Sequence, residues 1–241
     1  MSQSELGILE HIEELRRRIL WALAAVAAGV VISAFFADKI LVWLTAPLPG
    51  EGLEQLEAIS LTENVGVFMQ ATLLSGIAFA MPVVVLQLWK FIQPGLYSNE
   101  RRYVYLLVPM ATLLFLSGAA FCYYVMLPVA VPFMLDFLDI PTRPRPSEYF
   151  PFITSLLLWV GISFELPLLV FFLAKVRVVN HRALIKNWRV AILLIAVLAA
   201  AITPTPDPIN MGIVMIPLVV LYFLSIFLAW IAYPKVKESS E

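Results

Sequence analysis

The chain has 241 residues, of which 61% are hydrophobic and only 14% charged, and its formal net charge is −1. Its mean hydropathy is +0.91. Soluble domains are usually about 25% charged, so this composition excludes an ordinary soluble domain and indicates a polytopic membrane protein. The small net charge gives no bulk attraction to nucleic acid, and we expect no nucleic-acid partner.

The N-terminal segment is charged and amphipathic. Within residues 1–18, Glu13 with Arg17 and Glu14 with Arg18 have the i,i+4 spacing of favourable helical ion pairs. No convincing cleavage site follows this polar start, so we expect no cleavable signal peptide.

Six apolar runs follow, and they predict one all-α membrane domain over residues 1–241. About 20 apolar residues are enough for a helix to cross a bilayer core of about 30 Å. The six predicted transmembrane helices are at about 19–36, 66–89, 103–127, 152–174, 188–202 and 209–231.

The first run and the polar segment after it carry two local predictions. Ala25 and Gly29 lie four residues apart, a spacing that predicts a close-packing helix face. In the polar segment we expect short interfacial helices around Leu41–Trp43 and Leu53–Ile59.

The third and fifth runs depart from the usual length of a span. Tyr103–Leu135 is uncharged but too long for one span, so we expect the part after residue 127 to leave the bilayer as a surface segment. The proline-rich loop Asp136–Pro151 should be rigid and extended. Residues 188–202 would form a helix of only about 22 Å, which is short for a normal bilayer.

The fourth run contains a single charged residue, Glu165. A charge at this depth is costly, so the carboxyl should be protonated, paired, or facing a polar groove. Pro167 removes a backbone donor and frees the carbonyl one turn upstream, near Ser163. Glu165 either belongs to a functional site or hydrogen-bonds a neighbouring helix and only holds the bundle together.

Positive charge is distributed unequally between the predicted loops. Only Lys39, Arg143 and Arg145 lie on the side opposite the termini, and all other Lys and Arg residues lie on the terminus side. By the positive-inside rule, both termini are expected to be cytoplasmic in a multi-pass protein of the cytoplasmic (inner) membrane.

The sequence lacks the common catalytic motifs. There is no phosphate-binding GxxxxGK[ST] loop and no HExxH motif, and His11 and His181 both lie outside the apolar runs. Glu165 has no obvious partner carboxylate. We therefore expect no enzymatic activity, no metal site and no cofactor.

Two carboxylates lie just before predicted spans. Glu14 has an ordinary explanation as the partner of Arg18. Glu100 has one as an acid in the first turn of a helix capped by Ser98 or Asn99. Together they could instead place acidic groups at the cytoplasmic mouth of a membrane groove, which suits an arginine-bearing ligand.

A series of motifs along the whole chain resembles the TatC family, the multi-spanning component of the twin-arginine protein translocase. The motifs are HIEELRRRI at 11–19, APL at 46–48, LWKFIQPGLYSNERR at 88–102, GISFELP at 161–167, ITPTPDP at 202–208 and IPL at 216–218. Each motif is weak alone, but their order makes the set specific.

The resemblance implies a function, a shape and partners. The protein would bind twin-arginine signal peptides and export folded proteins across the cytoplasmic membrane, driven by the proton-motive force. Its six helices would form a concave, glove-like bundle. Its partners would be single-span TatA- and TatB-type proteins, the latter near the fifth helix, and the receptor complex would be an oligomer.

The resemblance also assigns roles to residues. Glu14 and Glu100 would receive the arginine pair of the signal peptide. The same two motifs contribute the rest of that surface: Arg16, Phe91, Pro94, Leu96, Arg101 and Arg102. Glu165 matches the family's membrane-embedded acid, and Pro47 and Asp207 match outer-loop or partner-contact positions.

The chain departs from the family pattern in two places. Phe223 follows Tyr222 where relatives usually carry an acidic residue, and Asn210-Met211 stand where relatives often have Ser-Gln. Both departures remove polar groups near the fifth and sixth helices, where partners are expected to dock.

Two other functional classes remain open. A small proton-coupled secondary transporter could use Glu165 as its coupling acid, with proline-broken helices around a midplane site. The halves of the chain show no internal repeat, which argues against it. The third class is a purely structural membrane scaffold without a ligand.

Overall fold

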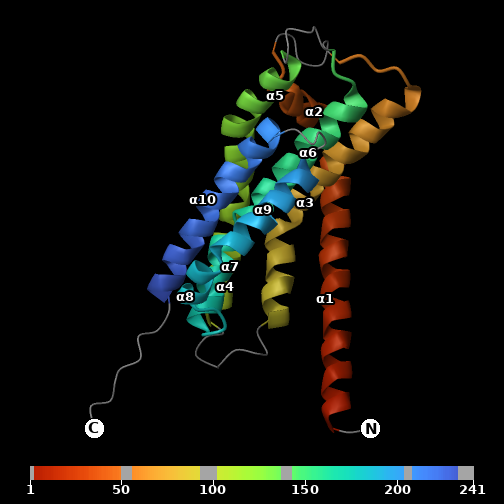
Figure 1. Cartoon of the computed structure of the whole chain (residues 1–241). Helices are drawn as coiled ribbons and strands as arrows, with labels where there is room; N and C mark the ends of the chain where they lie inside the picture. Colours follow the sequence, from red (N-terminus) through yellow and green to blue (C-terminus); the bar gives the residue numbers. More distant parts are fainter. Residues whose placement is uncertain (1–2, 50–55, 93–101, 137–142, 204–207, 233–241) are drawn as a thin grey trace, which may run out of the picture. The chain divides into compact units, whose positions relative to one another are not determined.

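The computed structural model describes residues 3–49, 56–92, 102–136, 143–203 and 208–232, without the side chains of 3–10, 61, 92 and 102–105. All regular secondary structure in these ranges is helical, which confirms the all-α prediction. In chain order (Figure 1), the elements are α1 (Gln3–Ala34), α2 (Ala37–Thr45), α3 (Leu61–Ile92), α4 (Arg102–Phe121), the π-helical turn η3 (Cys122–Met126), α5 (Leu127–Leu135), α6 (Pro146–Ser163), α7 (Leu166–Lys175), α8 (His181–Lys186), α9 (Trp188–Ile202) and α10 (Pro208–Ala232).

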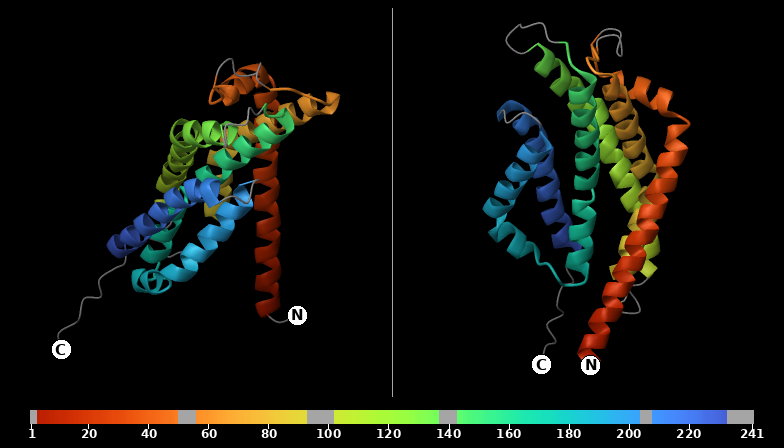
Figure 2. Two further views of the ribbon diagram at one scale, coloured as in Figure 1. Left: turned by 45° about the horizontal axis from the view of Figure 1, so that its top comes forward. Right: turned by 90° about the vertical axis from the view of Figure 1, so that its right-hand side faces the viewer.

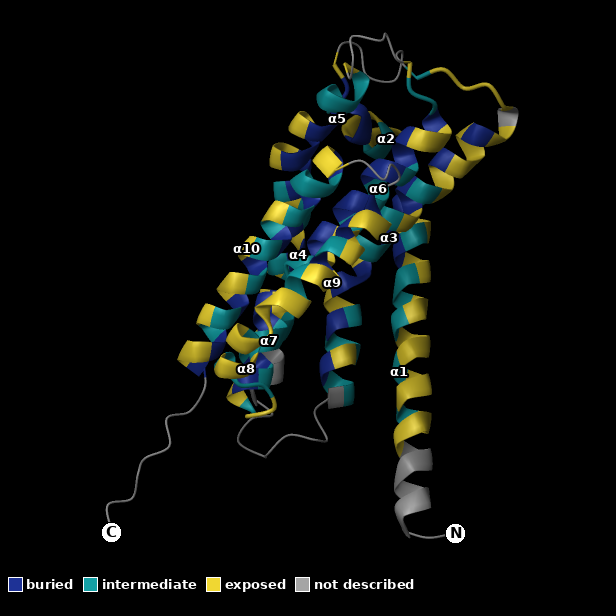
Figure 3. Cartoon of the chain, viewed as in Figure 1, coloured by how far each residue is buried: buried dark blue, intermediate teal, exposed yellow. Residues whose placement is uncertain are grey.

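The described helices have the lengths and composition of membrane spans. Five helical stretches are long and apolar enough to cross a membrane, and the shorter apolar helix α9 corresponds to the predicted fifth run. Large apolar side chains are exposed along α1, among them Leu20, Trp21 and Leu23. Figure 3 shows this exposed surface along α1. Lipid rather than water is the environment that suits such a surface.

The chain divides into two compact units. The first unit comprises residues 1–116 and 135–154 and contains α1, α2, α3, most of α4 and the start of α6. The second unit comprises residues 117–134 and 155–241 and contains η3, α5, the end of α6 and helices α7 to α10.

A close helix crossing organises the first unit. A Cβ added to Gly29 of α1 would lie 2.4 Å from the carbonyl oxygen of Gly76 of α3, and one added to Gly76 would lie 2.6 Å from the Val30 nitrogen. The backbones therefore approach to a distance that only glycine allows. This confirms the prediction that Gly29 lies on a close-packing face.

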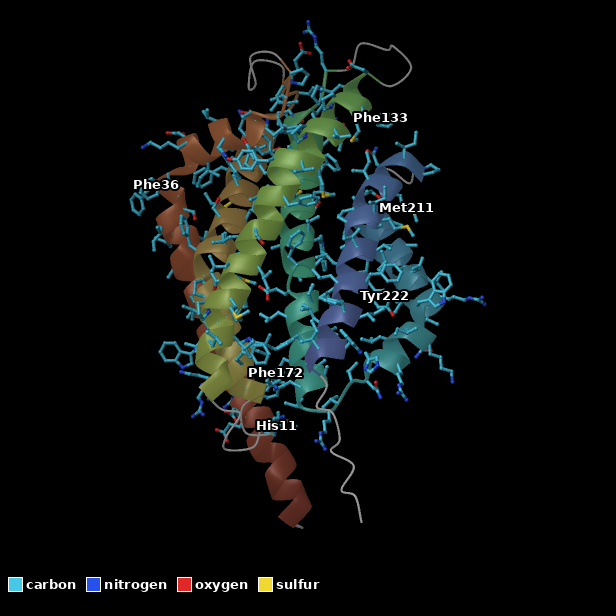
Figure 4. All side chains as sticks on the ribbon, turned by 90° about the vertical axis from the view of Figure 1, so that its left-hand side faces the viewer. His11, Phe36, Phe133, Phe172, Met211 and Tyr222 are labelled. Atoms are coloured by element: carbon cyan, nitrogen blue, oxygen red, sulfur yellow. The ribbon has the colours of Figure 1, made fainter. Side chains whose placement is uncertain are left out.

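In the second unit, α7, α8 and α9 all pack on α10. Figure 2 shows α9 and α10 as an antiparallel pair. Ala174 of α7 is buried in one cluster with Ala229 and Ala232 of α10. Tyr222, labelled in Figure 4, donates a hydrogen bond of 2.8 Å from its hydroxyl on α10 to the carbonyl of Leu184 on α8. This bond fixes the short helix that precedes α9.

Three local predictions need correction or refinement. The helix predicted near Leu41–Trp43 is confirmed as part of α2, and its interfacial position stays a prediction. In the second predicted helix, residues 56–59 are not helical and 53–55 lie outside the described residues. The segment after residue 127 is helical as α5, which follows the π-helical turn η3 directly and contains Pro132; its departure from the bilayer stays a prediction.

The loop Asp136–Pro151 was expected to be extended throughout, and this is wrong for its second half. Helix α6 begins at Pro146, where proline is compatible with a helix because the first position needs no N–H donor. The carbonyl of Arg145 accepts the backbone N–H groups of Glu148 and Tyr149, both at 3.0 Å.

Candidate functional site

Glu14 lies on one face of α1 and is paired within its own helix. Arg18 donates a hydrogen bond from Nη2 to Glu14 Oε1 at 3.0 Å, and both side chains are 22% exposed. This is the ion pair predicted by the i,i+4 spacing. The other predicted pair is wrong, because Glu13 lies 3.9 Å from Arg16 rather than beside Arg17. Both members of that contact are about 75% exposed, so solvent competes with either pairing.

Helix α3 completes the surroundings of this pair. Arg18 Nη1 also donates to Gln87 Oε1 at 3.4 Å, so the guanidinium bridges α1 and α3. One turn further toward the N-terminus of α1, the ring of His11 stacks on Phe91 with centroids 4.5 Å apart. His11 is exposed and is the first residue of α1 whose side chain is described; it is labelled in Figure 4.

Two hollows adjoin the Glu14–Arg18 pair. A hollow of about 390 Å³ is lined mainly by charged residues, Glu13, Glu14, Arg16 and Arg17, together with Leu20. An almost entirely apolar groove of about 170 Å³ runs between α1 and α3, lined by Leu15, Arg18, Ile19, Ala22, Val84, Gln87, Leu88 and Phe91. The predicted residues Glu14, Arg16 and Phe91 therefore lie together at this end of the α1–α3 pair, beside both charged and apolar surface.

Other predicted residues cannot be placed in this site. Pro94, Leu96, Glu100, Arg101 and Asp207 lie outside the described residues, and Arg102 begins α4 with its side chain undescribed.

Glu165 lies at a break between two helices. Helix α6 ends at Ser163, and α7 begins at Leu166 with Pro167 in its first turn. Pro167 cannot donate to the Ser163 carbonyl, as the sequence predicted, and the Ser163 hydroxyl donates to the Trp159 carbonyl at 2.7 Å. Among the described atoms, Glu165 Oε1 is buried and has no hydrogen-bond partner. The break thus gathers several polar groups in an otherwise apolar helix.

Packing on α4 holds this break in place. A Cβ at Gly118 would lie 2.7 Å from the ring of Phe164, so glycine leaves the space that this ring fills. The Phe164 ring also lies 5.7 Å from the ring of Phe121. Glu165 is therefore presented from a fixed position rather than from a loop.

Pro47 follows α2 and is half-buried. Within the first unit it lies near the start of α3, whereas Glu14 lies near the end of α3. Its neighbours Leu44 and Leu48 are buried, and the Tyr149 hydroxyl donates to the Leu44 carbonyl at 2.9 Å. Arg145 pairs with the buried Glu63 at 2.5 Å. The segment around Pro47 is thereby fixed to the starts of α3 and α6.

Sequence reasoning missed several of these residues. No local pattern links Arg18 to Gln87 or Glu63 to Arg145, because the partners are 69 and 82 residues apart. Among the described residues, no group of three His, Cys, Asp or Glu side chains could hold a metal ion.

Comparison with known proteins gives a consistent result. The family model described as TatC, Sec-independent protein translocase protein, matches residues 10–217. A Sec-independent protein translocase protein TatC from Koribacter versatilis (strain Ellin345) is 38% identical over 236 residues, which cover 95% of this chain and 87% of the relative. TatCy from Bacillus subtilis (strain 168) is 35% identical over 243 residues, covering 100% of this chain and 95% of the relative. A crystal structure of the twin arginine translocase receptor TatC superimposes with a TM-score of 0.82 at 32% identity, covering 92% of this chain and 99% of that one.

Proposed function

The chain belongs to the TatC family of Sec-independent protein translocase proteins, and we propose that it is the subunit of a twin-arginine translocase that binds the signal peptide. Members of this family are membrane components of a protein translocase rather than enzymes. The observation that carries the proposal for this chain is the Glu14–Arg18 pair, whose glutamate lines the charged hollow and whose arginine lines the apolar groove.

The two hollows match the two parts of a signal peptide. An exposed arginine–carboxylate pair contributes only about 0.2–1 kcal/mol, so two such pairs cannot hold a precursor firmly. Bidentate geometry in a partly desolvated site strengthens each pair. The remaining affinity comes from apolar residues of the peptide that pack in the α1–α3 groove. The apolar residues that line this groove include Leu15, Ile19, Val84, Leu88 and Phe91.

Glu14→Gln and Glu100→Gln test the charged part of this proposal. Each substitution should weaken binding of a twin-arginine peptide to the purified protein, because the amide keeps the shape but not the charge. The salt dependence of binding should also fall in the double variant. Glu57→Gln, which removes a carboxylate from an exposed pair with Arg143 at the opposite end of α3, is the matched control. Unchanged affinity and salt dependence in the double variant would show that these acids do not bind the arginine pair.

The orientation and the partners belong to the same proposal. Both termini lie in the cytoplasm, as the distribution of Lys and Arg indicates, and the membrane is the cytoplasmic one. Single-span TatA- and TatB-type proteins bind along α9. This helix supports the assignment because its 15 residues span only about 22 Å, and its exposed face carries Val190, Leu193, Leu194, Val197 and Leu198. Pro47, Asp207 and Glu165 are proposed as further contacts with partners or precursor.

The comparisons do not support the alternative of a small proton-coupled transporter. Every similarity reported for the chain is to a protein translocase component, and these similarities extend over most of its length. We propose that export takes place in the assembled translocase and that the proton-motive force drives it.

A further inference from the structure

The carboxylate proposed to receive a ligand arginine already holds an arginine of its own chain. Arg18 Nη2 lies 3.0 Å from Glu14 Oε1, within a contact that is only partly exposed. The guanidinium is held from a second side, because Nη1 donates to Gln87 Oε1 on α3. Chemically, Arg18 on Glu14 is the same interaction that the signal peptide would make.

We propose that Arg18 is an intramolecular competitor that occupies Glu14 in the free protein and is displaced when a signal-peptide arginine binds. This inference rests on the proposed function, in which Glu14 receives that arginine. Displacement does not leave the Arg18 guanidinium without an acceptor, because Gln87 stays within reach on α3. The exchange therefore replaces one arginine–carboxylate pair with another.

Competition of this kind has a defined thermodynamic consequence. A competitor within the chain divides the intrinsic affinity by a constant factor, which depends on the Glu14–Arg18 pair alone. The i,i+4 arrangement with glutamate first is the favourable one, but such pairs are weak. Removing Arg18 should therefore tighten peptide binding by about two- to fivefold. The same factor applies to any ligand cation, so a twin-lysine peptide should gain as much as a twin-arginine peptide.

A general charge effect needs a separate control. Arg17 is exposed and adjacent in sequence, and among the described side chains it pairs with no carboxylate. Arg17→Gln removes one positive charge, as Arg18→Gln does, but leaves the ion pair between Glu14 and Arg18 intact. Arg17 lines the same hollow as Glu14 but is exposed, so its loss removes only screened repulsion of the peptide's cations and frees no carboxylate. Its effect should therefore be smaller than that of Arg18→Gln and should decrease at high salt.

The experiment measures anisotropy of a labelled twin-arginine peptide with the full-length protein in nanodiscs, at low and high salt. Arg18→Gln should bind two- to fivefold more tightly, and Arg18→Lys, which restores a cation within reach of Glu14, should reverse most of this gain. In a protein that already carries Glu14→Gln, Arg18→Gln should no longer tighten peptide binding, because position 14 then has no carboxylate for which Arg18 and the peptide compete. The thermal stability of each variant, measured in parallel, establishes that the binding protein is folded.

The possible failures are distinguishable. If Glu14→Gln binds as well as the unaltered protein, the proposed role of Glu14 is wrong. If Glu14→Gln binds the peptide weakly but Arg18→Gln binds it no more tightly than Arg17→Gln does, the proposal that Arg18 competes for Glu14 is wrong, while the proposed function stands. A gain for the arginine peptide without an equal gain for the lysine peptide would also refute it, because Arg18 would then be selecting between ligands.

Discussion

Replacing Gly76 with alanine should push α1 and α3 apart at their crossing. A Cβ at Gly76 lies 2.6 Å from the Val30 nitrogen and 2.8 Å from the Val30 Cα, whereas ordinary contacts begin at 3.4 Å. These atoms belong to the backbone and cannot rotate away. The helices must therefore separate by about 0.8 Å to restore normal contact distances.

The cost of this separation follows from close packing. Overpacking by one methyl group usually destabilises a protein by about 1–3 kcal/mol. A gap of this size also forfeits a quarter to a half of the dispersion energy of the atom pairs along the crossing. We therefore expect a loss of about 2–3 kcal/mol for Gly76→Ala.

Gly66 provides a matched control in the same helix. It is exposed, and a Cβ added there meets nothing within 4 Å. Alanine should therefore stabilise α3 at this position by up to about 1 kcal/mol, the usual difference in helix propensity. The same substitution in the same helix thus has opposite expected signs.

Thermal unfolding in detergent measures the difference between the two variants. A chain of this size shifts its Tm by about 2–4 °C per kcal/mol, so Gly76→Ala should melt roughly 4–16 °C below Gly66→Ala. Equal melting temperatures would refute the close crossing, since the two substitutions differ only in what the added methyl group meets.

Three further outcomes are expected. Glu63→Gln should lower the free energy of unfolding by about 1–3 kcal/mol, because it leaves Arg145 without its buried partner. Melting curves should show a far smaller loss for Glu57→Gln, because its ion pair with Arg143 is exposed. Glu165→Gln should retain most export of a twin-arginine reporter and Glu165→Leu much less, and equal export by both at matched expression would remove Glu165 from the functional site. Inserting three or four leucines after Leu198 should impair export or partner assembly, whereas normal export would show that the short α9 has no such role.

Local patterns predicted the features whose cause is local. The apolar runs other than the fifth predicted the five long helical stretches, because each of these runs contains enough residues to cross a bilayer. Pro167 predicted the freed carbonyl of Ser163, since its missing N–H acts on the preceding turn, but the predicted single helix over 152–174 is wrong, because the structure divides it into α6 and α7. The Glu14–Arg18 pair followed from helical spacing alone.

The features that failed or were missed depend on tertiary contacts or on context. Gly29 was recognised as a close-packing residue, but its partner Gly76 was not, because the sequence does not say which helices cross. The prolines before α6 suggested an extended loop, yet Pro146 occupies the one helical position where proline is favourable. Glu63 and Arg145 pair only because α3 and α6 begin side by side.

This division between local and tertiary contacts also separates the two parts of the proposed ligand site. Glu14 and Arg18 lie on one helix, so their pairing survives a shift between α1 and α3. The apolar groove and the 3.4 Å contact from Arg18 to Gln87 need both helices, and that contact is already at the limit of hydrogen bonding. Gln87 lies about 16 Å along α3 from Gly76, with Pro82 between them in the same helix, so a shift of α3 at the crossing also moves Gln87. A folded Gly76→Ala protein should therefore lose the apolar, salt-independent part of peptide affinity and keep the salt-dependent part that Glu14 provides.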